Sequence, residues 1–300
     1  AVLMLIGVLT TLLSNEPKIK RPKILNNKKN FKFLLVIILS IISLILIYSN
    51  IQNPFNRNSI FLSFLFSTLR LAGCFGIAYL IINFFIKINF ISKSNFKSTY
   101  INPIINFISK YGKFAFLILL LISLYRIADV VMGVVANVFY LEKGYSVKDI
   151  ATYSKFFGVF ATILGGFLGG YFSLKFGTMK SLFVGALIAA SSNLLFAWLS
   201  VSPTNIKFLI TVITADNISS GFAGAAFVIY LSGLTSVKFT ATQYALFTSI
   251  MLFIPKLIAG YSGSWVDIIG YQNFFVLTAV LGIPVLILII WISKIAPIKD

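Results

Sequence analysis

The stretch LISLYRIADVVMGVVANVFY, residues 121–140, decides the fold class of this 300-residue chain. It is apolar enough and long enough to form a helix that crosses a bilayer, which takes about 20 residues. Yet Arg126 and Asp129 lie near its middle, three positions apart, and Asn137 follows them. Ionisable residues are costly at membrane depth, so they usually mark a functional site. The stretch therefore predicts a membrane span that carries a polar function.

Similar apolar runs recur along the chain and predict an all-α, polytopic membrane protein. Hydrophobic residues make up 59% of the sequence and charged residues only 11%, which is not the balance of a soluble domain of this length. Segments of alternating polarity, as in a membrane β-barrel, are missing from the sequence. The predicted complete spans are 33–49, 59–86, 114–140, 150–172, 181–200, 208–236, 243–263 and 273–293.

The spans and the polar segments between them predict five parts. Residues 1–14 are apolar but too few for a complete span, so we expect the end of a truncated transmembrane helix, in a chain that looks like a C-terminal fragment. Residues 15–32 form a basic cytoplasmic loop. Residues 33–113 hold two additional spans and a second basic loop. Residues 114–293 form a six-helix transporter half, and residues 294–300 form a cytoplasmic tail.

The excess of basic residues predicts how the spans are oriented. The chain has 25 Lys+Arg against 7 Asp+Glu, a net charge of +18. Such an excess would suggest nucleic acid on a soluble protein, but no base-reading motif accompanies it, so we expect no nucleic-acid partner. With alternating sides, 17 basic residues fall on the side of loops 15–32 and 87–113, four on the other side and four inside spans. Because Lys and Arg favour the cytoplasmic side, both loops and the C-terminus are predicted to face the cytoplasm.

Two similar segments suggest an internal repeat within the six-helix unit. GYFSLKFG, residues 170–177, joins its second and third spans, and GSWVDIIG, residues 263–270, joins its fifth and sixth. Each segment has glycine at both ends, and the predicted topology puts them on opposite sides of the membrane. Three spans repeated in inverted orientation are typical of secondary transporters. Glycines that merely close two tight turns would give the same pattern.

The residue types that are scarce limit the chemistry. A single cysteine, Cys74, excludes an internal disulfide, and the lack of histidine removes histidine acid–base catalysis and the usual zinc sites. An intramembrane aspartyl protease would need two facing aspartates, and Asp129 and Asp216 are available. The GxGD context of such enzymes is missing, since the runs read RIADV and TADN. We therefore expect no enzyme, no catalytic residue, no metal and no cofactor.

Several longer motifs resemble a known transporter family. GGYFSLKFGTMK, residues 169–180, is similar to the loop motif of the major facilitator superfamily, with Leu174 where that motif usually has Asp. A closer resemblance, over roughly residues 114–293, is to the anhydromuropeptide permeases (AmpG-type) of bacterial inner membranes. It rests on the runs YRIADV, YSKFFG, SSNLLFAWLS, ADNISSGFAGAAFVIYLSGLTSVKFTATQYAL and GYSGSWVDIIGYQNFF.

The resemblance implies a multi-pass inner-membrane protein that imports anhydromuropeptides for peptidoglycan recycling, driven by protons. Its expected partners are a small sugar-peptide substrate, protons, membrane lipid and a missing N-terminal transporter half. A fragment or degenerate paralogue that inserts but transports nothing is the alternative, because a substrate site between repeats needs both sides.

Polar residues inside the spans form the candidate site. Arg126 and Asp129 share a helix face and can neutralise one another or bracket a bound group. Asp216 has no cation within four residues on its own helix. In a chain without histidine, carboxylates are the natural proton carriers, so Asp216 is the expected proton-coupling residue. The expected substrate-binding or gating residues are Tyr125, Arg126, Asp129, Asn137, Asn217, Gln243, Tyr244 and Lys256.

Structural roles are open for several of these residues. The Arg126–Asp129 pair would also serve to lock helix packing. Gln243 would also serve as a helix cap. Lys256 lies deep in its predicted span and would be able to pair with a carboxylate of another helix.

Overall fold

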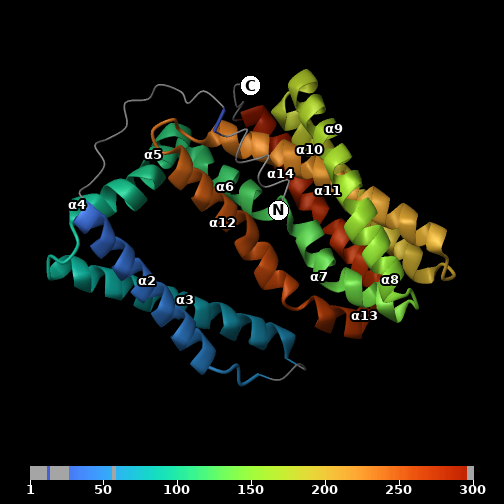
Figure 1. Ribbon diagram of the computed structural model, residues 1–300, viewed down its shortest axis with the longest axis horizontal. Helices are drawn as coiled ribbons and strands as arrows, with labels where there is room; N and C mark the ends of the chain where they lie inside the picture. Colours follow the sequence, from blue (N-terminus) through green and yellow to red (C-terminus); the bar gives the residue numbers. More distant parts are fainter. Residues whose placement is uncertain (1–11, 14–26, 56–58, 296–300) are drawn as a thin grey trace. The chain divides into compact units, whose positions relative to one another are not determined.

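A computed structural model describes residues 12–13, 27–55 and 59–295 of the chain (Figure 1). Helices follow one another through these ranges, and no strand occurs within them. Eight helical segments are long and apolar enough to cross a membrane. The predicted all-α polytopic class and the eight complete spans are therefore confirmed. The predicted partial span 1–14, apart from Leu12 and Leu13, and most of loop 15–32 lie outside the described residues.

The chain forms two compact units. The smaller unit comprises residues 1–49 and 74–92 and contains most of helix α2 (Asn27–Asn50) and the second half of α3 (Ile60–Lys87). Most of its described side chains are exposed, and the buried ones include Val36, Ser40 and Cys74. An apolar helix that exposes its side chains is suited to contact with lipid.

The larger unit comprises residues 50–73 and 93–300 and contains the six predicted spans of the transporter half. The structure divides several of these spans into shorter helices. Their bounds are α6 (Ala115–Leu124), α7 (Ile127–Glu142), α8 (Val147–Ile150), a π-helix (Ala151–Phe157), α9 (Gly158–Phe176), α10 (Thr178–Val201), α11 (Ile206–Leu234), α12 (Thr240–Ala259), α13 (Ser262–Val280) and α14 (Gly282–Ile295).

The predicted basic loop 87–113 differs from expectation, because most of it is helical. It forms α4 (Lys93–Phe96), a π-helical turn (Lys97–Ile101) and α5 (Asn102–Tyr111). α5 buries Pro103 and Phe107, and the Phe107 ring packs against Phe247 of α12, with their centroids 5.0 Å apart. Its exposed residues are mixed, because Ser109 and Lys110 lie among the exposed Ile104, Ile105 and Ile108. The segment is an amphipathic helix that docks on the bundle.

Small residues allow α9 and α11 to approach to backbone contact. Four small, buried residues recur at every fourth position of α9: Ala161, Gly165, Gly169 and Ser173. A Cβ atom added to Gly165 would overlap the Ile218 carbonyl oxygen of α11. A Cβ atom added to Gly221 of α11 would overlap the Thr162 carbonyl oxygen of α9 in return. The two helices therefore form a close small-residue seam.

Both glycines that end the suspected repeat segments close tight turns. Gly177, between α9 and α10, has φ 87° and ψ 161°, and Gly270, within α13, has φ 76° and ψ 164°. Residues 264–272 lie between two predicted spans, but they do not form an extended loop, since residues 262–269 are helical and the regular backbone is interrupted only at Gly270. The shared conformation is what an inverted repeat would produce, and it also fits two tight turns that arose separately.

Candidate functional site

A break in the third span positions the charged pair. α6 ends at Leu124 and α7 begins at Ile127, and Arg126 between them has φ −98° and ψ 12°. Asp129 lies in the first turn of α7, where unpaired backbone N–H groups and the helix dipole favour a negative charge. Arg126 Nε lies 3.2 Å from Asp129 Oδ2, and the two side chains are 22% and 14% exposed. The predicted pair is thus formed, at the start of a helix rather than within one.

The Arg126 guanidinium also reaches α11. Its Nη2 donates a hydrogen bond to Ser220 Oγ at 3.2 Å. The guanidinium lies beside Gly224, one turn further along α11, where an added Cβ atom would be 3.4 Å from Nη1, an ordinary contact distance. Arg126 therefore links the carboxylate of α7 to the polar face of α11.

Asp216 lies on the same helix as Ser220 and extends the polar group to α10. Ser192 Oγ of α10 lies 3.5 Å from Asp216 Oδ1, at the outer limit of a hydrogen bond. Ser219 Oγ donates to the Asp216 carbonyl oxygen at 2.8 Å and lies 3.2 Å from Ser192 Oγ. Asp216 also interacts electrostatically with Asp129 and Arg126.

These contacts form two sets of polar residues that adjoin along α11, and we call the two sets together the charge cluster. Its members are Arg126, Asp129, Ser192, Asp216, Ser219 and Ser220. It contains one cation and two carboxylates, contributed by α7, α11 and the α6–α7 break. With Arg126 charged and both carboxylates ionised, the cluster has a net charge of −1, and one additional proton would neutralise it.

Tyr125 borders the cluster, but its polar atom is used in packing. The side chain is buried, and its hydroxyl lies 3.2 Å from the Leu182 carbonyl oxygen and 3.4 Å from that of Ala223. Its ring stacks on Phe227 with the centroids 4.4 Å apart. Tyr125 joins the α6–α7 break to α10 and α11 and is not open to a ligand in this conformation.

Asn217 likewise connects helices. Its Nδ2 donates to the Ile213 carbonyl oxygen at 2.8 Å, and its Oδ1 accepts from Thr162 Oγ1 of α9 at 3.0 Å. Its amide lies close to Gly158 of α9, where an added Cβ atom would be only 3.1 Å away. Asn217 therefore belongs to the seam between α9 and α11.

The other predicted site residues lie apart from the charge cluster. Gln243 is buried, donates to the Pro103 carbonyl oxygen at 2.9 Å and accepts from the Ser236 backbone N–H at 2.7 Å. It joins α5 to the start of α12. Tyr244 is half-buried against the core. Asn137 and Lys256 are exposed, and within the described part of the chain Lys256 forms no ion pair with either cluster carboxylate.

Sequence reasoning missed the serines of the cluster and a neighbouring amide. Ser192, Ser219 and Ser220 carry no signal of their own, because serine is common in membrane helices and bonds to the backbone of its own turn. Asn193 follows Ser192 and is completely buried. Among the described residues, neither of its amide atoms has a hydrogen-bond partner. Its position in the middle of an apolar span was the available signal, since buried polar groups are normally paired.

Comparison with known proteins supports the resemblance seen in the motifs. No protein-family model matches the chain. The chain is 33% identical over 207 residues to "Putative transporter AmpG 4" of Rickettsia conorii. The aligned region covers 69% of this chain and 50% of that protein. It is 34% identical over 254 residues to "Putative transporter AmpG 1" of the same species, covering 82% and 61% respectively.

A third relative is "Putative transporter AmpG 1" of Rickettsia prowazekii, which is 31% identical over 268 residues. That match covers 86% of this chain and 59% of the relative. The chain thus spans about half to three fifths of the length of these curated relatives.

Proposed function

The chain is homologous to the AmpG-type transporters over most of its length, and on that premise we propose that it forms part of a secondary transporter. The finer proposal is that this transporter imports anhydromuropeptides across the bacterial inner membrane, driven by protons. The charge cluster is the observation that supports it. Ionisable groups deep in membrane helices are rare and usually belong to substrate or proton pathways.

In this proposal Asp216 carries the proton. Arg126 is paired directly with Asp129 and holds the nearer carboxylate as its counter-ion. Among the described residues, the hydrogen-bond partner of the Asp216 carboxylate is the Ser192 hydroxyl, so its negative charge has less direct compensation. A proton on Asp216 would balance the cluster, and its loss would leave one uncompensated charge to be met by a rearrangement of the helices.

Arg126 would couple this proton to the substrate. It lies at the α6–α7 break and donates a hydrogen bond to Ser220 of α11. A movement of α7 relative to α11 would therefore change its contacts. A substrate carboxylate that replaced Asp129 as its partner would change those contacts. Broken helices with exposed backbone ends are common at the substrate sites of secondary transporters.

Uptake by membrane vesicles that contain the protein tests this function. We expect labelled GlcNAc-anhydromuramyl peptide to accumulate when the outside is more acidic than the inside, and a protonophore to abolish accumulation. Vesicles without the protein are the control. Equal uptake with and without the proton gradient would reject proton coupling, and uptake no greater than in the control vesicles would reject the substrate.

A further inference from the structure

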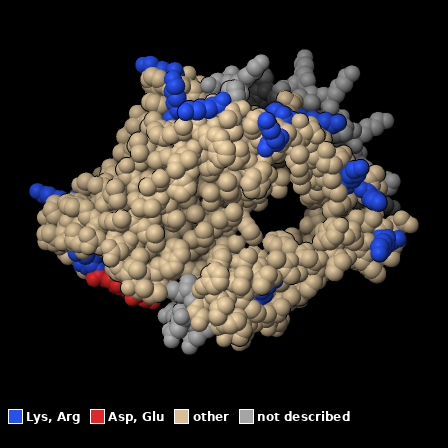
Figure 2. Space-filling view, turned by 180° about the vertical axis from the view of Figure 1, so that it is seen from behind, with Lys and Arg blue, Asp and Glu red and all other residues tan. Residues whose placement is uncertain are grey.

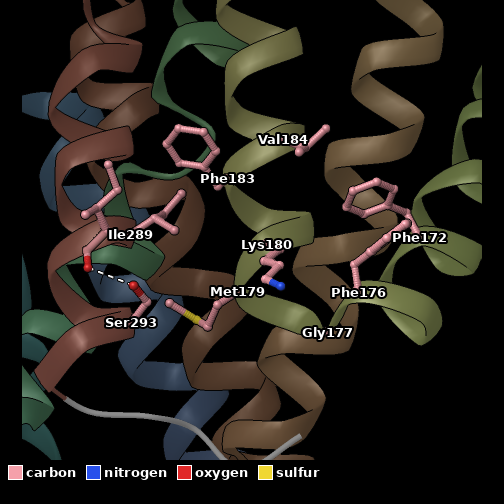
Figure 3. Close-up of a pocket in the computed structure, with 10 residues that line it drawn as sticks. Phe172, Phe176, Gly177, Met179, Lys180, Phe183, Val184, Ile289 and Ser293 are labelled. Carbon is pink, nitrogen blue, oxygen red and sulfur yellow. Dashed lines mark hydrogen bonds between the residues drawn. The ribbon is translucent and has the colours of Figure 1, made fainter.

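A cavity of about 570 Å³ opens between the ends of α9, α10 and α14, apart from the charge cluster (Figure 3). Its size is within the range of about 300–1,000 Å³ that is common for ligand pockets. Lys180, which lines it, is twelve residues from Ser192 on α10, or roughly 18 Å along the helix. The lining residues are Phe172, Phe176, Gly177, Met179, Lys180, Phe183, Val184, Ile289, Ile290 and Ser293.

The walls of the cavity are apolar and continue onto an exposed apolar surface. Phe172 and Phe176 come from the last turns of α9, and Ile289 and Ile290 from α14. Phe176 and Ile290 are exposed, as are Ile283 and Ile287 further along α14. On a membrane-spanning helix, such a surface contacts acyl chains. The cavity is therefore a recess in a face suited to contact with lipid.

The end of the cavity carries a cation. Lys180 is exposed, and Figure 3 shows its side chain between the aromatic residues of α9 and the residues of α14. Within the described part of the chain it forms no ion pair or hydrogen bond. Ser293 donates its hydroxyl hydrogen to the Ile290 carbonyl oxygen at 2.8 Å, so its proton is already used. The last turns of α9 and α14 add Lys175 and Lys294 near the same end.

The carboxylates of the described chain lie elsewhere. None of the five described ones, Asp129, Glu142, Asp149, Asp216 and Asp267, lines the cavity. Figure 2 shows basic side chains at the end of the bundle where α9 meets α10. On the face it displays, the acidic side chains lie at the opposite end. The cation at the cavity therefore lacks a described partner within the chain, and an anion from the membrane would complement it.

We propose that this cavity binds an anionic phospholipid. One acyl chain lies along Phe172, Phe183 and Ile289, and the phosphate lies at Lys180. The two parts of the site match the two parts of that ligand, since a free anion would leave the apolar walls unused and a neutral lipid would leave the lysine unused. The distribution of basic residues predicts that this end faces the cytoplasm, and basic pockets between membrane helices on that side bind anionic head groups.

Native mass spectrometry of the purified chain in detergent, titrated with defined lipids, tests the proposal. The probes are phosphatidylglycerol, phosphatidylcholine with the same acyl chains, and glycerol phosphate without chains. We expect phosphatidylglycerol to be retained preferentially. Lys180→Ala should weaken its retention roughly fivefold, as expected for one basic residue at a membrane surface. Lys180→Arg should restore retention, and phosphatidylcholine should not respond to either change.

Two further variants separate the cavity from general surface charge. Val184→Trp fills the apolar recess and should weaken retention of both lipids. Lys238→Ala is the matched control, because Lys238 is exposed on the same predicted side and does not line the cavity. A cooperative thermal transition in each variant confirms folding.

Four outcomes would overturn the proposal. They are equal retention of both lipids by the wild type, an equal effect of Lys238→Ala and Lys180→Ala, full competition by glycerol phosphate, and no retained lipid at all. The third outcome would indicate a free-anion site. Because uptake is not measured, the result is independent of the transport proposal.

Discussion

Arg126 contacts both Asp129 and Ser220, and it can do so because it lies outside the regular helical backbone, between α6 and α7. In a continuous helix the side chain would be restricted to one face, with Asp129 as its neighbour. At the break between α6 and α7 it also reaches Ser220 of α11. The spacing of the two charges predicted their pairing, because residues three apart meet on a helix. The contact with Ser220 was not predictable, because it depends on how two helices pack.

The other predicted site residues differ from Arg126 and Asp129 in whether their polar atoms already have partners within the protein. Tyr125, Asn217 and Gln243 use their polar atoms on backbone carbonyls or neighbouring side chains. A polar residue in a span signals a buried hydrogen bond, and the sequence does not reveal whether its partner is protein or substrate. Asp129 and Asp216 differ because a carboxylate in a membrane needs a charge or a proton.

Asp216→Asn is expected to abolish accumulation driven by the proton gradient while substrate exchange at equal concentrations continues. The amide keeps the shape and the Ser192 contact but cannot exchange a proton. Counterflow and gradient-driven uptake in vesicles measure the two activities. Asp267→Asn, an exposed carboxylate on α13, is the matched control and should behave as wild type. Normal accumulation by Asp216→Asn would contradict the assignment.

Arg126→Ala should destabilise the protein more than the double change Arg126→Ala/Asp129→Ala. The single change leaves the carboxylate without its cation in a medium of low dielectric constant, at a cost of about 3–5 kcal/mol unless it takes up a proton. Thermal unfolding in detergent gives the coupling energy. Ser220→Ala, which removes only the second partner, should cost about 1 kcal/mol. Strictly additive effects of the two charge changes would show that the ion pair contributes nothing.

At the scale of the helices, apolar run length predicted all eight complete spans, because the thickness of the membrane fixes the length of a crossing helix. Short-range geometry was less predictable. Residues 102–111 form α5, one face of which docks on α12, and such a tertiary contact is not visible in the sequence. Residues 264–269 are helical although the sequence predicts a loop there, because they include the polar Ser264 and Asp267. Polarity in a sequence therefore does not reveal whether the backbone of a polar segment is helical.

The seam between α9 and α11 makes a prediction with an internal control. Gly165→Ala places a methyl group against the Ile218 carbonyl oxygen, whereas Gly170→Ala meets nothing within 4 Å. Both glycines lie within α9. We expect Gly165→Ala to lower the free energy of unfolding by about 1–3 kcal/mol, as overpacking does. Gly170→Ala should be neutral or slightly stabilising, because alanine favours a helix. Similar unfolding temperatures for the two variants would argue against the close approach.

For the whole molecule, the distribution of basic residues predicts which ends of the spans face the cytoplasm. Val147 at the start of α8 and Val237 between α11 and α12 are matched probes, since each side chain is 71% exposed. In a Cys74→Ser background, Val237→Cys should react with a membrane-impermeant maleimide only after the membrane is opened. Val147→Cys should react in intact cells. Labelling of both from outside would mean that the orientation or the number of spans between them is wrong.

The backbone angles at Gly177 and Gly270 determine which chirality of residue each turn accepts. Gly177 and Gly270 both combine a φ near +80° with an extended ψ, a region that residues of the L series avoid. The mirror image of this conformation is ordinary extended backbone. The backbone of a D-alanine at either position would therefore be unstrained, whereas that of an L-alanine would be strained. Two corners of the bundle thus require an achiral residue or one of the opposite chirality.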